Sequence, residues 1–417
     1  MIDTDNYKIT NCLCCNSKVL LTTLNLGNQP PANSYTASNE NSLHDFPLEL
    51  MLCTNCWHSQ LSFCVDRASI FNNYSYVSGT SSTLINYFNW FANSLYACIG
   101  KDSTVLEIAA NDGSLIKEMS KCGLKCIGVD PAKNIVDIAQ ANGLPVEYGY
   151  WPEYSKNIKH SFDAIVAMNV LAHVDDPLNF LIACASKLSF DGIILVQPSQ
   201  ARMFENGEFD TIYHEHISFF NSKSIAALAN RAGLKLVDSF LVKIHGDSPV
   251  YILKHINSTS QIYNFSSFRE GDYSIAEDLN EYEEKIKLFK QSTYLNFKTK
   301  AINRMNEVTS IVNQYKTKNY KIVFVGAAAK AITFINSTKI KPDFLLDESP
   351  YKIGLFAPGS LCKVESLNSI SKYSFNEPCL FIISAWNFRT ELVKKIKMIG
   401  APGNSIFLSY FPEVNFI

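Results

Sequence analysis

Four cysteines in the first 56 residues form the most specific chemical pattern of this chain. They are arranged as two CxxC pairs, which are Cys12 with Cys15 and Cys53 with Cys56. Two such pairs supply four thiolates to one tetrahedral Zn²⁺ ion, and four filled ligand positions are typical of a structural zinc site. Cys14 directly precedes Cys15 and could take its place as a ligand, and His58 is a further alternative ligand. A redox CxxC normally lies at a helix start beside a βαβ unit. No such unit precedes this region, so we predict structural zinc.

A second group of residues lies where an apolar run ends and a helix is expected to begin. The run VLEIAA continues into Asn-Asp-Gly at 111–113, and small residues there let the backbone approach a nucleoside cofactor at a helix N-terminus. Asp130 follows Glu107 after 23 positions (130 − 107), a spacing at which an acidic residue hydrogen-bonds ribose hydroxyls. GxGxxG is absent, and Glu107 and Asp112 would repel a pyrophosphate. The two carboxylates suit the sulfonium and amino groups of S-adenosylmethionine, which we therefore predict as the cofactor.

A third apolar run ends in MNVLAHV at 168–174, a position where methyltransferases commonly line the adenine and methionine parts of this cofactor. The predicted cofactor-binding residues are Glu107, Ala109, Asn111, Asp112, Gly113, Asp130, Pro131, Asn169 and His173.

The segment 209–216 (FDTIYHEH) holds a dense group of titratable side chains. Imidazole accepts a proton near pH 7, and a neighbouring carboxylate raises its basicity or selects its tautomer. In an extended strand Glu215 would point away from Tyr213, whereas in a loop all four YHEH side chains could converge. Metal chelation by HxH is a rival, although the HExxH helix pattern is absent, and a structural polar turn is another alternative. The density of titratable groups favours a functional role. YSYVSGTS (74–81) and HGDS (245–248) are individually weak, because packing or turn formation explains them equally well.

The elements expected to position these residues are short apolar runs separated by helix-length segments, which predict βαβ units and a parallel sheet. The runs of the first series are Thr104–Ala109, Lys125–Val129, Phe162–Ala167 and Gly192–Gln197. The runs of a second series are Lys321–Val325, Phe344–Asp347, Leu380–Ser384 and Ser405–Leu408. Residues 273–320 are charged and helical, as expected for a connector. We predict an α/β protein with a zinc-ribbon-like module at 1–75, a Rossmann-type cofactor domain at 76–260 and a Rossmann-like α/β domain at 261–417.

Composition narrows the class of protein. The chain has 417 residues, 47% of them hydrophobic, and a formal net charge of −2. That charge and the lack of basic runs near the cysteine pairs argue against a zinc-dependent nucleic-acid-binding protein. The N-terminus lacks the apolar core of a secretory signal. The sequence also contains no stretch of about 18 apolar residues, so we expect no membrane span. We expect a cytoplasmic protein whose thiols stay reduced.

Together these segments resemble the sugar C-methyltransferase family that acts on nucleotide-linked deoxyketosugars. The resemblance covers nearly the whole chain: the paired CxxC, YSYVSGTSS, EIAANDGSL with GVDPA, NVLAHVDD, FDTIYHEHISFF, the HG-S turn, VGAAAKAITFIN, LLDESPYKIGLFAPG and SAWNF. It implies a zinc-binding N-terminal module, a central S-adenosylmethionine domain and a C-terminal domain that binds the nucleotide sugar.

The resemblance also implies a reaction on a 4-keto sugar. A base removes the C-3 proton beside the carbonyl, and the resulting enolate attacks the methyl group of the cofactor. By similarity, His216 is the base, Tyr213 and Glu215 position it and the sugar, and Tyr76 contacts the substrate. An O- or N-methyltransferase acting on a related sugar, with His216 deprotonating a hydroxyl, is the alternative. The intact YHEH argues against a non-catalytic scaffold.

The turn VGAAAK (325–330) places small residues and a cation between a strand and a helix, where a phosphate could bind. A small-residue helix start packed on its sheet is equally consistent with this pattern. The resemblance favours a nucleotide-sugar diphosphate site with Gly326, Lys330 and Asn387 as contacts, and His245 as a further substrate contact. We expect a nucleotide-linked sugar as substrate, no nucleic-acid or membrane partner, and a monomer or weak dimer.

The chain departs from the family's usual pattern at three places. They are Gln197 where Glu is frequent, Asn86 where His is frequent, and Asp247–Pro249 within a segment that often reads HGGSLR. All three lie in regions expected near the ligands.

Overall fold

The computed structural model describes residues 8–38, 44–66, 77–199, 201–372 and 377–417. Two compact units each combine segments that are far apart in sequence. Unit 1 comprises Met1–Leu21, Met51–Ala201 and Ile217–Phe289, and unit 2 comprises Thr22–Leu50, Arg202–His216 and Lys290–Ile417. These units do not follow the three contiguous domains expected from the sequence, because residues 22–50 and 202–216 both pack within unit 2. The boundaries of those domains stay a prediction.

A seven-stranded sheet of mostly parallel strands forms the centre of unit 1. Its order is β10-β11-β8-β7-β4-β5-β6, and β11 is antiparallel to both of its neighbours. The strands are β4 (Thr104–Ile108), β5 (Lys125–Asp130), β6 (Val146–Tyr148), β7 (Phe162–Met168), β8 (Leu188–Gln197), β10 (Leu234–Val242) and β11 (Ser248–His255). The parallel strands β4, β5, β7 and β8 end at the same edge of the sheet, which is where ligands bind in open α/β sheets.

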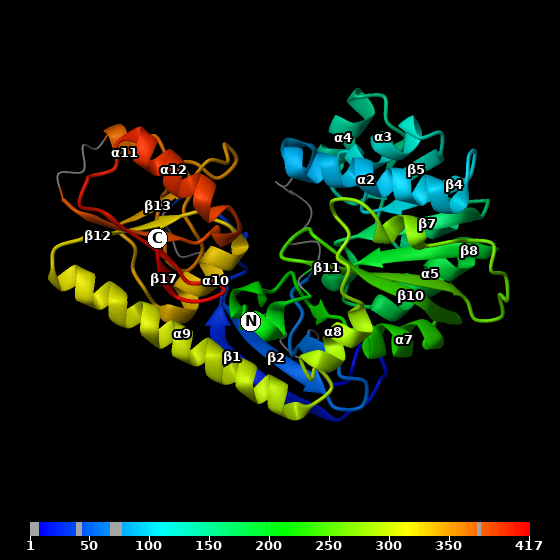
Figure 1. Cartoon of the computed structure of the whole chain (residues 1–417), viewed down its shortest axis with the longest axis horizontal. Helices are drawn as coiled ribbons and strands as arrows, with labels where there is room; N and C mark the ends of the chain where they lie inside the picture. Colours follow the sequence, from blue (N-terminus) through cyan, green and yellow to red (C-terminus); the bar gives the residue numbers. More distant parts are fainter. Residues whose placement is uncertain (1–7, 39–43, 67–76, 200, 373–376) are drawn as a thin grey trace. The chain divides into compact units, whose positions relative to one another are not determined.

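Helices cover both faces of this sheet (Figure 1). On one face are α2 (Ser82–Ile99), α3 (Ser114–Lys121) and α4 (Lys133–Ala141); on the other are α5 (Pro177–Lys187), α7 (Ser222–Arg231) and α8 (Leu279–Lys285). Their starting points are set by local capping. The Ser81 side chain accepts the Leu84 N–H at the start of α2, and Asp176 accepts the Asn179 N–H at the start of α5.

The N-terminal cysteine pairs adjoin a small four-stranded sheet with the order β1-β2-β3-β9. Its strands are β1 (Leu20–Gln29), β2 (Phe46–Cys53), β3 (Ser59–Leu61) and β9 (Ser218–Phe219). Short 3₁₀ segments of unit 1 are η2 (Ser78–Thr80), η3 (Glu153–Asn157), η4 (Leu171–His173) and η6 (Ser266–Arg269).

Unit 2 is built on a six-stranded sheet with the order β14-β13-β12-β15-β16-β17, whose first five strands are parallel. Numbered within this sheet, the order is 3-2-1-4-5-6, the arrangement of doubly wound dinucleotide-binding folds. The strands are β12 (Lys321–Val325), β13 (Phe344–Asp347), β14 (Val364–Ser366), β15 (Cys379–Ile383), β16 (Ile406–Ser409) and β17 (Asn415–Phe416). The helical segments are α6 (Met203–Asn206), η5 (Phe209–Thr211), α9 (Gln291–Thr317), α10 (Ala329–Thr338), α11 (Ser369–Lys372), η7 (Trp386–Phe388) and α12 (Arg389–Ile399).

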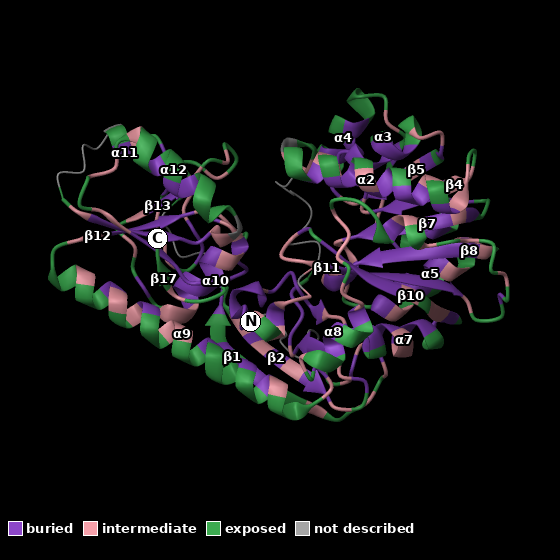
Figure 2. Cartoon of the chain, viewed as in Figure 1, coloured by how far each residue is buried: buried purple, intermediate pink, exposed green. Residues whose placement is uncertain are grey.

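Every apolar run predicted from the sequence is a strand, and the α/β fold class is confirmed. The strands of both large sheets are mostly buried, whereas the charged segment after residue 273 forms α8 and the long, largely exposed α9 (Figure 2). Within the described residues, no helix is both long enough and apolar enough to cross a membrane.

Candidate functional site

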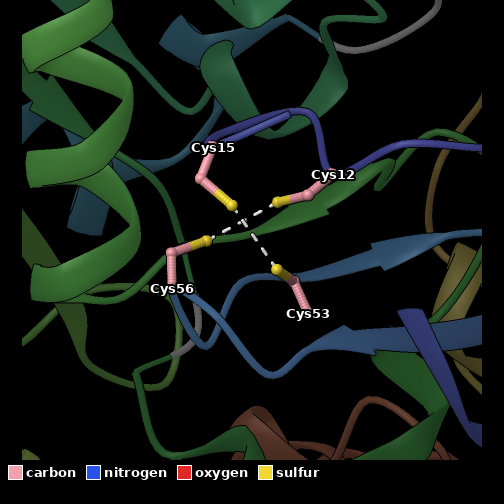
Figure 3. Close-up of side chains that lie close together, drawn as sticks. All are labelled: Cys12, Cys15, Cys53 and Cys56. Atoms are coloured by element: carbon pink, nitrogen blue, oxygen red, sulfur yellow. Dashed lines mark hydrogen bonds between the residues drawn. The ribbon is translucent and has the colours of Figure 1, made fainter. Parts of the chain in front are cut away.

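The four predicted metal ligands meet at one point in unit 1. Figure 3 shows their sulfur atoms converging from two short turns, one for each CxxC pair. All four sulfur atoms lie within 4.8 Å of one another, and Cys12–Cys56 and Cys15–Cys53 are each 3.5 Å apart. A tetrahedral Zn²⁺ with bonds of about 2.3 Å separates its sulfur ligands by roughly 3.8 Å. The sulfur positions therefore fit a structural zinc ion.

The two cysteine turns share one backbone conformation. The residue after the second cysteine, Asn16 in one turn and Trp57 in the other, has φ of 63° and donates its N–H to the carbonyl of the first cysteine at 2.8 Å. This geometry resolves the register left open by the sequence. Cys14 is fully buried outside the sulfur cluster, and His58 contacts Ser218 Oγ at 3.2 Å instead of joining the cysteines.

The predicted cofactor loop follows β4 at the carboxyl edge of the seven-stranded sheet. Ala109, Asn111 and Gly113 all have positive φ, at 59°, 51° and 75°, so the chain turns sharply before α3 begins. An added Cβ at Gly128 would lie 2.5 Å from Ile116 Cδ1 and 2.6 Å from Ala110 Cβ. Only glycine allows β5 to pack this closely against the loop and its helix.

Three buried carboxylates surround this loop. Asp130 accepts the N–H groups of Asn111 and Ala132 at 2.9 and 2.8 Å, and it thereby holds the loop in place. Glu107 is 4% exposed, and no hydrogen bond satisfies its Oε2 atom. Burial raises the pKa of Glu107 well above its usual range, and the nearby charges of Asp130 and Asp112 raise it further. A cationic ligand at this edge would stabilise the ionised form of Glu107.

The turn η2 lies in the segment 74–81, whose sequence pattern alone was a weak indication of function, and it contacts the cofactor loop. The Ser78 N–H donates to Asn111 Oδ1 and the Gly79 N–H donates to Asp112 Oδ2, both at 2.9 Å. An added Cβ at Gly79 would lie 2.5 Å from the same Asp112 oxygen, so a larger residue would have to displace the Asp112 carboxylate. The small residues of SGT were the available sequence signal for this contact.

The ends of β7 and β8 carry further polar groups at the same edge. Asn169 has φ of 52°, and its N–H donates to the Gln197 carbonyl at 2.7 Å. The Tyr87 hydroxyl donates to Gln197 Oε1, while Gln197 Nε2 is buried with no hydrogen-bond partner. His173 ends the short turn η4 after β7, and Pro131 follows Asp130 after β5. The structure thus brings the predicted cofactor residues to one edge of the sheet.

The reaction segment 209–216 belongs to unit 2, where Phe209 packs on Phe334 of α10 with ring centroids 5.6 Å apart. His216 is 5% exposed, and its Nδ1 lies 2.9 Å from the Thr211 carbonyl oxygen. A carbonyl only accepts, so Nδ1 carries the proton and Nε2 of the neutral ring is an acceptor. The Tyr213 hydroxyl lies 2.7 Å from Nε2 and is therefore its donor. This tautomer is the one that a general base requires.

The two remaining members of YHEH point to different partners. His214 Nε2 lies 3.2 Å from the Phe46 carbonyl, and burial lowers the pKa of His214 to about 4. Glu215 is 3% exposed and accepts a hydrogen bond from Asn33 Nδ2 at 2.8 Å. The two histidines therefore do not chelate together, and the four cysteines are the metal-binding cluster found among the described residues.

The predicted phosphate turn of unit 2 lies after β12. Gly326 has φ of 101°, and an added Cβ would lie 2.7 Å from Ala385 Cβ. The Ala327 N–H donates to Asp347 Oδ2 at 2.6 Å, so a carboxylate already accepts from this turn. Lys330 Nζ lies 4.8 Å from the centroid of the Trp386 ring.

The remaining predicted substrate residues are distributed between the two units. His245 lies in the turn between β10 and β11 of unit 1, with φ of 53°, whereas the phosphate turn belongs to unit 2. Tyr76 lies outside the described residues, as does the side chain of Asn387. Sequence reasoning missed Asn33, which donates to Glu215, and Lys352, whose charge lowers the pKa of Glu215; no local pattern links either residue to the reaction segment.

Comparisons with known proteins match successive parts of the chain. Family models match residues 12–71 (putative zinc binding domain), 89–239 (methyltransferase domain) and 266–412 (C-methyltransferase C-terminal domain). The C-methyltransferase NovU of Streptomyces niveus is 24% identical over 415 residues, covering 97% of this chain and 96% of NovU.

More distant similarities are confined to part of the chain. A ubiquinone biosynthesis O-methyltransferase of Dinoroseobacter shibae is 27% identical over 154 residues, which are 33% of this chain and 62% of that protein. The solved structure of the mitomycin 7-O-methyltransferase MmcR has a TM-score of 0.35 and 18% identity, covering 42% of this chain and 55% of that one. The methyltransferase model over residues 89–239 and the near full-length match agree: the chain is an S-adenosylmethionine-dependent methyltransferase, and the relative that it matches along almost its whole length is a C-methyltransferase.

Proposed function

We propose that this protein transfers a methyl group to a carbon, C-3, of a nucleotide-linked 4-keto-deoxysugar. The geometry of His216 carries this proposal. Its Nδ1 proton is held by a backbone carbonyl and its Nε2 accepts from Tyr213, so the ring is prepared to take one proton. The full-length similarity to a C-methyltransferase supports carbon as the methylated atom.

Proton removal beside a carbonyl needs a base together with a group that stabilises the enolate oxygen. In the proposal His216 Nε2 receives the C-3 proton, and the Tyr213 hydroxyl, which now donates to that nitrogen, is released to donate to the developing oxyanion. Donors of this kind are typically worth about 2.7–4 kcal/mol in a transition state. Nδ1 keeps its hydrogen bond to Thr211 throughout, so the imidazolium is also held in position.

S-adenosylmethionine supplies an electrophilic methyl group when it is bound. The residues proposed to hold it are those of the loop after β4 and the ends of β5 and β7. Glu107 and Asp112 would offset the positive charge of the cofactor, and Asp130 has further lone pairs for ribose hydroxyls after accepting two backbone N–H groups.

The nucleotide part of the substrate is proposed to bind at the switch point of the second sheet, between β12 and β15. Gly326 and the start of α10 lie at the carboxyl end of β12, where doubly wound sheets bind nucleotides. Lys330 and Asn387 are the proposed diphosphate contacts, and Tyr76 and His245 are proposed to contact the sugar.

The proposal is tested by incubating the full chain with S-adenosylmethionine and a panel of nucleotide 4-ketosugars, with mass spectrometry to detect the gain of one CH₂. His216→Asn should lose nearly all turnover while binding S-adenosylmethionine normally. His160→Asn, which changes an exposed histidine, is the matched control. Near-normal turnover of His216→Asn would refute the assignment of the base. A product with the new methyl on oxygen or nitrogen would instead identify the alternative O- or N-methyltransferase.

A further inference from the structure

We infer that Asn33, Tyr35 and Lys352 are positioning residues for methyl transfer: Asn33 holds Glu215 of the reaction segment, and Tyr35 and Lys352 both hold the turn after β12 beside the segment that carries Asn33. This inference rests on the proposed function of that segment. All of these residues belong to unit 2, although Asn33 precedes Glu215 by 182 positions. We call the three residues the Glu215 clamp.

Asn33 makes the direct contact. Its Nδ2 donates to Glu215 Oε1 at 2.8 Å, and Glu215 is only 3% exposed. A buried carboxylate needs such donors, because leaving a charged acceptor unsatisfied costs more than the hydrogen bond itself contributes. The amide of Asn33 therefore fixes the direction in which the carboxylate points.

Tyr35 and Lys352 converge on one backbone carbonyl next to this contact. The Tyr35 hydroxyl donates to the Ala327 carbonyl at 2.6 Å, and Lys352 Nζ donates to the same oxygen at 2.9 Å. Lys352 Nζ also lies 5.5 Å from the centroid of the Tyr35 ring. Because Ala327 follows β12 in the predicted phosphate turn, the clamp connects that turn to the reaction segment.

Backbone pairing holds the two parts of the clamp together. Thr36 and Phe356 exchange two hydrogen bonds, at 3.1 and 2.8 Å, which fixes the segment after Tyr35 beside the loop that carries Lys352. Gln29, 2% exposed, donates to Ser337 of α10 at 3.0 Å. The segment 29–36 is thus attached to α10 on one side of Asn33 and to the loop between β13 and β14 on the other.

Electrostatics give the clamp a measurable effect. Burial raises the pKa of Glu215 to about 7, while the hydrogen bond from Asn33 and the charge of Lys352 act in the opposite direction. Burial lowers the pKa of Lys352, and the charges of Asp347 and Glu215 raise it. The groups that act on Glu215 are therefore Asn33 and Lys352, with Asp347 acting on Lys352. Removing Lys352 should therefore raise the pKa of Glu215 further.

Glu215 directly precedes His216, so the contact that holds its side chain also fixes the backbone from which the proposed base extends. An ionised Glu215 accepts a charge-assisted hydrogen bond from Asn33, which is stronger than one to a neutral acid. Protonation of Glu215 would weaken that contact and lower the rate. The clamp is therefore expected to set the acid limb of the pH–rate profile. If the three residues had only a structural role, replacing them would not shift this limb.

The first test compares pH profiles of kcat/KM for the full chain and its Lys352→Met and Asn33→Ala variants. Lys352→Met should move the acid limb upward by roughly 1 pH unit, the shift expected on losing a nearby opposite charge. Asn33→Ala should move the acid limb in the same direction. Lys352→Arg keeps the positive charge and should therefore show the wild-type profile. Lys341→Met, which removes an exposed lysine of the same unit, should change nothing. A uniform loss of rate in Lys352→Met with an unmoved acid limb would overturn the inference.

The second test needs no substrate and separates this inference from the proposed function. Unfolding free energies at pH 8 are measured for wild type, Lys352→Met, Glu215→Gln and the double variant. If Lys352 acts on Glu215, its removal should be clearly more destabilising with Glu215 present than with glutamine at that position. Additive effects would overturn the clamp even if methyl transfer is found. Non-additive effects without transfer to any ketosugar would leave the clamp standing and refute the proposed function.

Discussion

Replacing Glu107 by glutamine should have opposite effects on cofactor affinity and on stability. Glu107 is 4% exposed, and burial and then the charges of Asp130 and Asp112 raise its pKa well above the usual range. An ionised Glu107 therefore destabilises the free protein but is favourable beside a cationic cofactor. Hydrogen bonds to charged groups contribute about 1.5–3 kcal/mol, which corresponds to roughly 10- to 150-fold in the dissociation constant of S-adenosylmethionine.

The pH dependence of both quantities follows from the same raised pKa. Glu107 has a higher pKa in the folded protein than in the unfolded chain. Its contribution to stability therefore falls as the pH rises from its pKa in the unfolded chain to its pKa in the folded protein. Affinity for the cationic cofactor should rise with pH over that range, because binding requires the ionised form. Both contributions should disappear in Glu107→Gln.

Isothermal titration calorimetry with S-adenosylmethionine and urea denaturation, each between pH 6 and 8, measure the two effects. Asp137→Asn changes the net charge equally at an exposed site of the same unit and should alter neither quantity. Unchanged affinity in Glu107→Gln, or affinity and stability lost together, would refute the role assigned to Glu107.

Three further predictions concern the zinc centre, the cofactor loop and the reaction segment. Cys15→Ser should lose stoichiometric zinc and melt at lower temperature whereas Cys14→Ser keeps zinc; metal analysis showing zinc retained in Cys15→Ser would place the fourth ligand elsewhere. Gly79→Ala should weaken S-adenosylmethionine binding by about 5- to 150-fold, the equivalent of 1–3 kcal/mol of overpacking, because the new methyl would lie 2.5 Å from a carboxylate oxygen of the cofactor loop. Gly403→Ala, where an added Cβ meets nothing within 4 Å, is its control, and equal affinity of the two variants would contradict the contact. Because burial lowers the pKa of His214 to about 4, stability should fall as pH drops from about 6.5 towards 4, by up to about 3 kcal/mol. His214→Phe should flatten this acid-side loss in denaturant titrations, and an equally steep loss would show that other groups cause it.

Local pattern was sufficient to predict the elements that carry the cofactor site. Each predicted apolar run is a strand, because a strand buried on both faces of a parallel sheet is a continuous apolar stretch. The spacing of the cysteine pairs likewise predicted the metal cluster. The choice between Cys14 and Cys15 needed coordinates, since it depends on which sulfur the turn after Cys12 directs towards the second pair.

Contacts between distant segments could not be predicted in this way. Nothing near Asn33 in the sequence indicates that its amide binds Glu215, 182 positions later. The geometry of YHEH was equally undetermined, because two backbone carbonyls, those of Phe46 and Thr211, decide where its histidines point. Such partners carry no side-chain signal of their own. The packing of residues 22–50 and 202–216 in unit 2 is long-range information of the same kind.

Methyl transfer to carbon, as we propose, is tested most directly by locating the new methyl group in the product. The full chain is incubated with S-adenosylmethionine carrying a ¹³C-labelled methyl group and a nucleotide-linked 4-keto-deoxysugar, and the product is examined by NMR. We expect a labelled methyl bonded to the carbon beside the ketone and retained through acid hydrolysis of the sugar. A label on oxygen or nitrogen, or no transfer to any 4-ketosugar of a panel, would contradict it.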